Sequence, residues 1–362
     1  MDSEPVTAKS LSWTYMVNAN TFERAYKDTL SGYSTWEQRE HAEQWVLNPE
    51  NIGPRIGIDE TSFCHELYTI VHNKDAHGKK GSIIAIVKGV RPQEVASVLL
   101  QIPEEERKKV STATMDLSDS MRAIVKIAFP EATVVRDCFH VIKRAGDGIE
   151  ELRLRFKRDA VKDVNRQKTE FKKYLEGLAK KRKQYRERRK KLGKKPCKGK
   201  KRGPKPKRLS TKFEPVKLEN GETTVDALTR CRTQLSKSRN KWTGKEEKRA
   251  KVLFEKYPKL KEAYNLVDDL RTIFRNKSLT PETAAGKLAV WYKKVTKSTL
   301  REIKSVKDSI KHYEDEILNY FDKRETNASA ESLNSRMKGF RSSLRGVRDI
   351  PYFFYRSMMI FG

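Results

Sequence analysis

The stretch from Arg55 to Thr61 places the strongest constraint on what this chain can fold into. It reads Arg-Ile-Gly-Ile-Asp-Glu-Thr, a short apolar run that follows Pro54 and closes on two acids. Such a run predicts a buried strand that delivers the Asp59 carboxylate to an edge of a sheet. A buried carboxylate costs several kcal/mol unless a basic group or a metal ion pairs with it. For this stretch alone, an acid that caps the following turn is an equally good interpretation.

Further acids occur downstream in settings of the same kind. Residues 110–115 predict a short strand that ends in Asp116, and Thr133-Val134-Val135 predicts another that ends at Asp137. Glu331 lies in the first turns of a predicted helix, with Asn334 and Lys338 near the same face because residues three and four apart are neighbours. Taken alone, Glu331 is better explained as an acid that suits the helix dipole, worth about 0.3–1 kcal/mol.

The order of predicted elements indicates an α/β fold. Strand patterns end near Asp59 and cover 67–71 and 82–87, a helix begins at Pro92, and a second helix covers 117–129 between the last two strands. Three strands, a helix, a strand, a helix and a strand is the order of an RNase H-like mixed five-stranded sheet with flanking helices, although a fold alone does not establish function.

Four segments are predicted along the chain. Residues 1–53 form a helical N-terminal arm, in which a helix-turn-helix near 18–31 is the less favoured alternative. Residues 54–140 form the first part of the core, and 141–325 form a large all-α basic insertion. Residues 326–362 supply the returning helix that carries Glu331 and the C-terminal part of the core.

Charge points to a polyanionic partner. The chain has 362 residues, 78 Lys and Arg against 48 Asp and Glu, and a formal charge of +30, which favours nucleic acid. No apolar run approaches the roughly 18 residues of a membrane span, and no signal peptide is visible, so we expect a cytoplasmic protein. The four cysteines form no Cys-x-x-Cys pair, which argues against a zinc site and predicts free thiols.

The densest basic run begins at Lys180, and a Gly/Pro/Lys stretch that follows it through Arg208 predicts a mobile loop. We expect the run to hold DNA through its phosphates; the alternative is a solvated charged face. The predicted DNA-binding residues are Lys180, Lys181, Arg182, Lys183, Arg186, Arg188, Arg189, Lys190, Lys191, Lys200, Lys201, Arg202 and Lys338.

Asp59, Asp116 and Glu331 together have the composition of a magnesium site. Mg²⁺ takes carboxylate oxygens and keeps water and phosphate as its other ligands, and Mn²⁺ is the expected substitute. A pair of such ions can activate a water or a 3′ hydroxyl and stabilise the leaving oxygen. No strongly nucleophilic side chain is then required.

Four sequence blocks resemble the signature blocks of the ISL-three family of bacterial insertion-sequence transposases. They are Ile-Asp-Glu-Thr-Ser at 58–62, Met-Asp-Leu-Ser at 115–118, Pro-Glu-Ala at 130–132 with Asp-Cys-Phe-His-Val at 137–141, and Asn-Ala-Ser-Ala-Glu-Ser-Leu-Asn at 327–334. The resemblance implies a DDE catalytic domain whose metal-binding triad is Asp59, Asp116 and Glu331.

The same resemblance places Asp137 and His140 in an Asp-x-Phe-His block, where they orient the strand or the metal ligands, as Asn334 would. The alternatives are an aspartate that caps the next helix and a histidine satisfied in the core. Cys138 stands where family members often have arginine, which removes the basis for a phosphate contact at that position.

We therefore predict a DNA transposase that cleaves and transfers strands at insertion-sequence ends. The alternatives are a catalytically inactive DNA-binding relic or regulator, and an RNase H-like nuclease without strand transfer. The expected partners are double-stranded DNA, from the element ends and the target, and further copies of the chain on that DNA. Relatives carry cysteine-rich and helix-turn-helix modules before the catalytic domain, so recognition of the ends is expected on a separate polypeptide or in reduced form.

Overall fold

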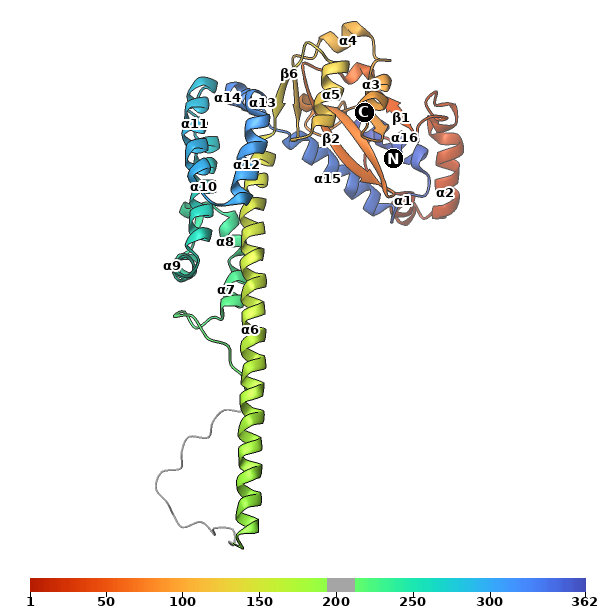
Figure 1. Cartoon of the computed structure of the whole chain (residues 1–362). Coiled ribbons are helices and arrows are strands. Elements are labelled where there is room, and N and C mark those ends of the chain that lie inside the picture. Colours follow the sequence, from red (N-terminus) through yellow and green to blue (C-terminus); the bar gives the residue numbers. More distant parts are fainter. Residues whose placement is uncertain (194–211) are drawn as a thin grey trace. The chain divides into compact units, whose positions relative to one another are not determined.

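The computed structural model describes residues 1–193 and 212–362 and divides into two compact units. Unit 1 comprises Met1–Arg144, Ile273–Tyr292 and Lys307–Gly362, and unit 2 comprises Ala145–Thr272 and Lys293–Val306. Helices α6, α10, α11 and α12 have residues in both units. Unit 1 is a mixed α/β structure, and the described part of unit 2 is helical (Figure 1).

Unit 1 is built on a six-stranded mixed sheet of strand order β1-β4-β3-β2-β5-β6. Strand β2 pairs in parallel with β5, and β5 with β6, whereas the other neighbours are antiparallel. The strands are β1 (Trp45–Leu47), β2 (Arg55–Phe63), β3 (Glu66–Asn73), β4 (Ile83–Lys88), β5 (Thr112–Met115) and β6 (Thr133–Arg136).

The sheet differs from the sequence prediction in two places. All five predicted strands are present, but the sixth, β1, lies in the segment predicted to be helical. Three residues are too few to show a strand period, and β1 forms only by pairing with β4. The predicted end of β2 at Asp59 was also wrong, because β3 pairs with β2 as far as Phe63.

Helices cover both faces of the sheet. On one face, α3 (Pro92–Leu99) and α5 (Asp119–Ala128) pack against strand residues that include Ile58 and Met115. On the other face, α15 (Ala328–Ser343) and α16 (Ile350–Phe361) pack against residues that include Phe63 and Ile70. Residues 58 and 59 therefore point to opposite faces, with Asp59 on the side of α15.

The helices begin where local chemistry favours it. Pro92 occupies the first turn of α3, where its missing N–H costs nothing, and Ser118 caps α5 by accepting from the Met121 amide. The short helices of the sheet unit are α4 (Glu104–Lys108), α13 (Glu314–Leu318) and α14 (Tyr320–Lys323), with 3₁₀ turns at Pro49–Asn51 and Lys74–Ala76.

The N-terminal segment is helical and packs on α16. It comprises α1 (Ala8–Tyr15), α2 (Ala19–Ala25), a π-helical turn (Tyr26–Leu30) and a 3₁₀ turn (Gly32–Thr35). The ring of Tyr33 lies 5.0 Å from that of Tyr352, and the buried Arg356 guanidinium donates to the Met1 and Val6 carbonyls.

The remaining helices lie wholly or partly in unit 2. They are α6 (Cys138–Lys191), α7 (Thr224–Arg230), α8 (Arg232–Ser236), α9 (Gly244–Lys256), α10 (Pro258–Arg275), α11 (Pro281–Lys297) and α12 (Arg301–His312), with a 3₁₀ turn at Arg239–Lys241. Apolar residues on these helices, such as Tyr264, Trp291 and Ile310, are buried.

No helix in the described ranges is long and apolar enough to cross a membrane. Cys64, Cys138 and Cys231 are free thiols, as predicted, and Cys197 lies outside the described residues.

Candidate active site

The registers of three neighbouring parallel strands align three carboxylates. In the β2–β5 pair Gly57 is opposite Thr114, so two residues further on Asp59 lies beside Asp116. In the β5–β6 pair Met115 is opposite Arg136, so the next residues, Asp116 and Asp137, are neighbours too. The Asp137 amide donates to the Met115 carbonyl at 2.8 Å, so the backbone hydrogen bonding between β5 and β6 continues as far as Asp137. The sheet thus presents Asp59, Asp116 and Asp137 in a row.

Asp59 is a partly buried carboxylate with a perturbed pKa. Its Oδ1 accepts from the Glu60 amide at 2.9 Å, and its Oδ2 accepts from the Asn334 side chain on α15. Burial, and then the negative charge of Asp116, raise the pKa of Asp59 to about 6. The ionised form is therefore costly in this protein, and a nearby cation would make it less so.

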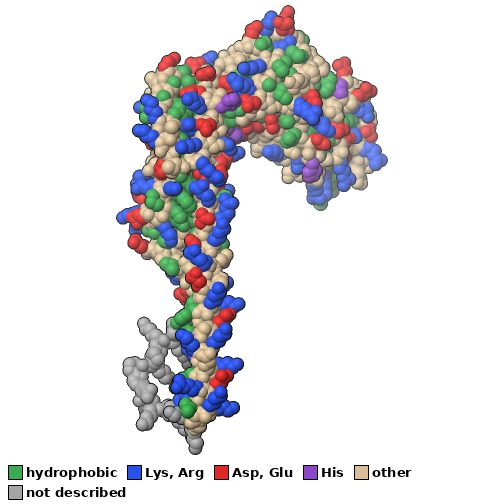
Figure 2. Space-filling view, viewed as in Figure 1, with side chains coloured by type: hydrophobic (Ala, Val, Ile, Leu, Met, Phe, Trp, Pro, Cys, Tyr) green, Lys and Arg blue, Asp and Glu red, His purple; other side chains and the backbone are tan. Residues whose placement is uncertain are grey.

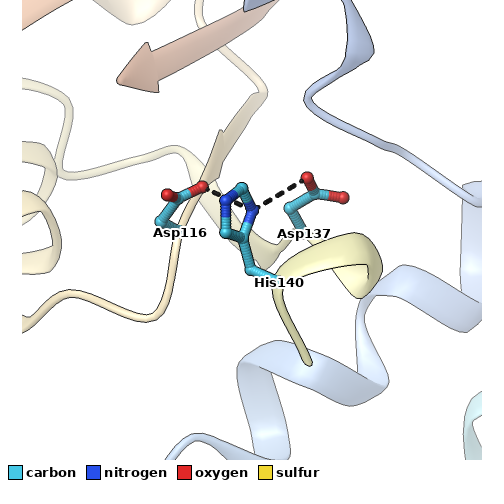
Figure 3. Close-up of side chains that lie close together, drawn as sticks. All are labelled: Asp116, Asp137 and His140. Atoms are coloured by element: carbon cyan, nitrogen blue, oxygen red, sulfur yellow. Dashed lines mark hydrogen bonds and ion pairs between the residues drawn. The ribbon is translucent and has the colours of Figure 1, made fainter. Parts of the chain in front are cut away.

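His140 bridges Asp116 and Asp137 from the first turn of α6 (Figure 3). Its Nδ1 lies 2.8 Å from Asp116 Oδ1 and 3.2 Å from Asp137 Oδ2. These two carboxylates raise the pKa of His140 to about 10, so the imidazole is protonated at neutral pH. One ligand atom from each of the three residues falls within 4.8 Å of the others, a spacing that would suit a metal ion.

Asp137 also caps α6, because its Oδ1 accepts from the Phe139 amide at 3.2 Å. The capping role and the contact with His140 use different oxygens of one buried carboxylate. Both interpretations of this residue from the sequence are therefore compatible with its position.

Helix α15 packs beside β2 and contacts it through Asn334. Asn327, just before the helix, donates from Nδ2 to the Ile58 carbonyl at 3.2 Å, and Asn334 reaches Asp59. Glu331 lies between them on the helix, four residues after Asn327 and three before Asn334, so it shares their face. Its side chain is exposed, and in the described ranges it has no hydrogen bond or ion pair and does not join the compact group around Asp116.

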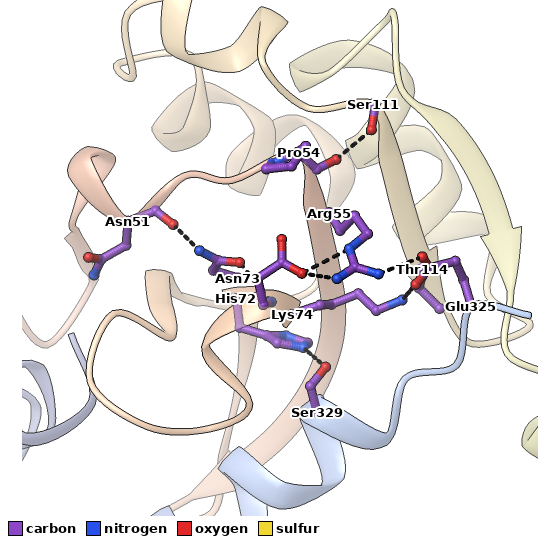
Figure 4. Close-up of polar contacts among 11 residues, drawn as sticks. Asn51, Pro54, Arg55, His72, Asn73, Lys74, Ser111, Thr114, Glu325 and Ser329 are labelled. Atoms are coloured by element: carbon purple, nitrogen blue, oxygen red, sulfur yellow. Dashed lines mark hydrogen bonds and ion pairs between the residues drawn. The ribbon is translucent and has the colours of Figure 1, made fainter. Parts of the chain in front are cut away.

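A buried ion-pair cluster holds the chain just before α15 (Figure 4). Lys74 Nζ donates to Thr114 Oγ1 at 2.7 Å and to Glu325, and Arg55 Nη1 donates to the other Glu325 oxygen at 3.2 Å. The side chains of Lys74 and Glu325 are only 7% and 8% exposed, so this pair is shielded from water. Arg55 also binds Asp75. The sequence analysis missed this cluster, because no local pattern links residue 74 to residue 325.

Close packing beside Gly57 completes the attachment of α15. Ser329 lies 3.0 Å from Nε2 of His72, a fully buried residue whose pKa is lowered to about 3 by burial, so the ring is neutral. A Cβ at position 57 would collide with the His72 ring and with Asn327. Glycine is therefore required here, since only its backbone lets α15 approach β2 this closely.

Replacing Glu325 by glutamine is expected to lower the free energy of unfolding by about 3 kcal/mol, because it leaves the buried Lys74 charge without its partner. The measurement is the thermal unfolding midpoint. Glu104→Gln, in the exposed pair with Lys108, is the matched control and should leave the midpoint nearly unchanged. Equal midpoints for the two variants would show that the buried pair contributes no more than a surface pair.

The predicted DNA-binding residues fall into two groups. Those from Lys180 to Lys191 lie on the last turns of α6 and are exposed apart from the half-buried Arg189, and Lys338 is exposed on α15. Lys200, Lys201, Arg202 and the predicted loop around them lie outside the described residues.

Comparison with known proteins identifies the family. The family model of the ISL-three DDE transposases, described as "Transposase", matches residues 56–202 and 207–357. The chain belongs to this family, as its sequence blocks indicated. Comparison with curated proteins and with solved structures finds no match.

Proposed function

We propose that this protein cuts DNA at the ends of an insertion element and joins the ends to a target, on an RNase H-like core that the helical stretch 141–325 interrupts. The observation that carries the proposal is the alignment of Asp59 beside Asp116, with Asn334 of α15 bound to Asp59 one turn from Glu331. The family match supports the same chemistry.

The chemistry of the proposed ligands suits a divalent cation. Asp59, Asp116 and Glu331 offer only carboxylate oxygens, the ligands that Mg²⁺ prefers, and Mn²⁺ is the expected substitute. The pKa of about 6 at Asp59 reflects burial and repulsion that a cation would relieve. When bound, the metal would lower the pKa of an attacking water or 3′ hydroxyl and stabilise the leaving oxygen.

The neighbouring side chains orient these ligands. Asn334 fixes one oxygen of Asp59, and the Glu60 amide fixes the other. His140 holds Asp116 beside Asp137 and supplies a positive charge between them. Asn327 and Ser329 fix the start of α15, which sets the position of Glu331 along β2. No side chain of this group has to act as a nucleophile.

The C-terminal end of α6, residues 180–191, is the proposed DNA-binding surface. Figure 2 shows Lys and Arg side chains along this helix, which is 54 residues long and therefore extends about 80 Å at 1.5 Å per residue. Its exposed cations suit the phosphates of double-stranded DNA, and Lys338, exposed on α15 one turn after Asn334, offers a further cation. Assembly of several copies on DNA, with a separate recognition polypeptide, remains part of the proposal.

Removing four cations from this surface is expected to flatten the slope of log affinity against log salt by about 3–4, because each phosphate contact contributes about 0.9. The loss should be similar on any DNA sequence. The substitutions are Lys180→Gln, Lys183→Gln, Arg186→Gln and Lys190→Gln.

The control removes four exposed cations from the sheet unit and should change the slope by less than one contact. Those substitutions are Arg91→Gln, Lys108→Gln, Lys109→Gln and Lys126→Gln. If both sets change the slope equally, α6 carries a solvated charged face rather than a DNA site.

A further inference from the structure

A cavity of about 580 Å³ opens in unit 2, and its lining residues are distant in sequence from Asp59, Asp116 and Glu331. Its walls are α9, the first turns of α10 and the stretch 239–242 that precedes α9. The volume falls in the range of about 300–1,000 Å³ that is common for small-molecule sites. Neither the metal site nor the basic run of α6 accounts for this cavity.

Three aromatic rings line the cavity. The Trp242 ring lies 4.9 Å from that of Tyr264, and the Phe254 ring lies 5.7 Å from it. Trp242 Nε1 donates to the Gln234 carbonyl at 2.9 Å, and the Tyr264 hydroxyl donates to the Lys237 carbonyl at 3.0 Å. Tyr264 and Phe254 are buried and Trp242 is half-buried. The Trp242 ring, held by its hydrogen bond and packed on the other two rings, is therefore the apolar surface that the cavity presents.

The rest of the lining carries unpaired positive charge. Within the described residues, none of the four cations in the lining has a side-chain hydrogen bond or an ion pair; they are Arg239, Lys248, Lys251 and Lys261. Two acids, Glu247 and Glu255, also line the cavity, so cations exceed acids by four to two. In contrast, nearby Lys237 and Arg249 are both engaged by glutamates.

We propose that this cavity binds one unpaired DNA base, which stacks on the Trp242 ring while the cations contact the flanking phosphates. Aromatic surface beside positive charge is how proteins hold single-stranded nucleic acid. A base inside a duplex is covered by its neighbours, so only an unpaired or flipped base can enter. The inference rests on the proposed function in that DNA is the substrate, and it adds that the insertion distinguishes unpaired from paired DNA.

The test uses the full chain and two short duplexes of one sequence. One is fully paired, and the other carries a single unpaired 2-aminopurine, whose fluorescence falls when it stacks. We expect about tenfold tighter binding of the duplex with the unpaired base, together with loss of fluorescence, since base stacking on an aromatic ring is worth about a factor of ten or more.

Two variants and one control separate the cavity from general charge. Lys248→Glu with Lys251→Glu should abolish the preference for the unpaired base. Trp242→Phe, which keeps an aromatic ring in place, should lower that preference severalfold and leave affinity for the paired duplex unchanged. The control, Lys241→Glu with Lys245→Glu, changes the same charge at exposed residues that do not line the cavity and should keep the preference.

The outcomes distinguish this inference from the proposed function. Equal affinity of the unmutated protein for both duplexes, or equal losses on both duplexes in the Lys248 and Lys251 variant, overturns the base-binding inference alone. Tight binding of an apolar peptide in the cavity with no effect of the unpaired base would likewise overturn it in favour of a protein partner. Absence of any DNA binding contradicts both.

Discussion

Replacing Glu331 by glutamine is expected to slow strand nicking at least about 10³-fold, roughly 4 kcal/mol of transition-state stabilisation. Glutamine keeps the size and helix propensity of the side chain but removes the charge that would hold a metal. Affinity for DNA should stay level or rise slightly, because a repulsive acid is lost. The measurements are gel shift and nicking, with Mg²⁺ or Mn²⁺, on DNA that carries the element's own ends.

Glu282→Gln is the matched control for this variant. Glu282 also lies exposed in the first turn of a helix, α11, so it shares the helix-dipole effect of Glu331 without its neighbours. The control should nick at the parent rate. If Glu331→Gln nicks as fast as the control, Glu331 only favours the start of α15. If the unmutated protein does not nick DNA with either ion, even with any partner polypeptide present, the result supports the alternative of an inactive DNA-binding relic.

Replacing Asp59 by asparagine is expected to slow nicking as much as Glu331→Gln does. Without metal, it should also raise the free energy of unfolding at pH 8 by about 1–2 kcal/mol. The pKa of Asp59 is about 6 in the folded chain against 3.8 for the ordinary group. Folding therefore favours the protonated form of Asp59. The stabilisation from this form is fully present below pH 3.8 and is lost as pH rises through 6. Above pH 6 the parent therefore carries an unfavourable buried charge that asparagine removes.

The pH profile and the metal response provide the check. The difference in unfolding midpoint should shrink as pH falls from about 7 to 4, where Asp59 is protonated. Mg²⁺ should stabilise the parent but not the Asp59 variant. Glu60→Gln, at the next residue on the opposite side of β2, should keep both the response to Mg²⁺ and nicking. A midpoint difference that does not change with pH would show that the Asp59 charge is not the cause.

The sequence predicted the local parts of this structure well. The strands around Ile58, Ala113 and Val134 and the helix that starts at Pro92 follow from apolar runs and a proline at a first turn. The positions of Asp116 and Asp137 at strand ends follow from the same patterns. Once the strands are known to be parallel neighbours, the adjacency of these acids needs no further information.

What the sequence did not reveal depends on contacts between distant residues. Strand β1 exists because β4 pairs with it, and the Lys74–Glu325 pair joins residues 251 positions apart. The requirement for glycine at position 57 depends on the His72 ring and Asn327, which meet only in the folded chain. The distance of Glu331 from the other acids depends on the position of a whole helix, so its role remains a prediction.

The extension of β2 beyond Asp59 makes the aligned acids unequal in how freely they can move. Asp59 lies in the middle of a nine-residue strand, opposite Ile70. The residues before and after it are also paired with β3, so its backbone is held in place. Asp116 follows the last residue of β5 and leads into the cap of α5. The Asp116 backbone is therefore freer to move than the Asp59 backbone. Amide hydrogen exchange should accordingly be slower at Asp59 than at Leu117.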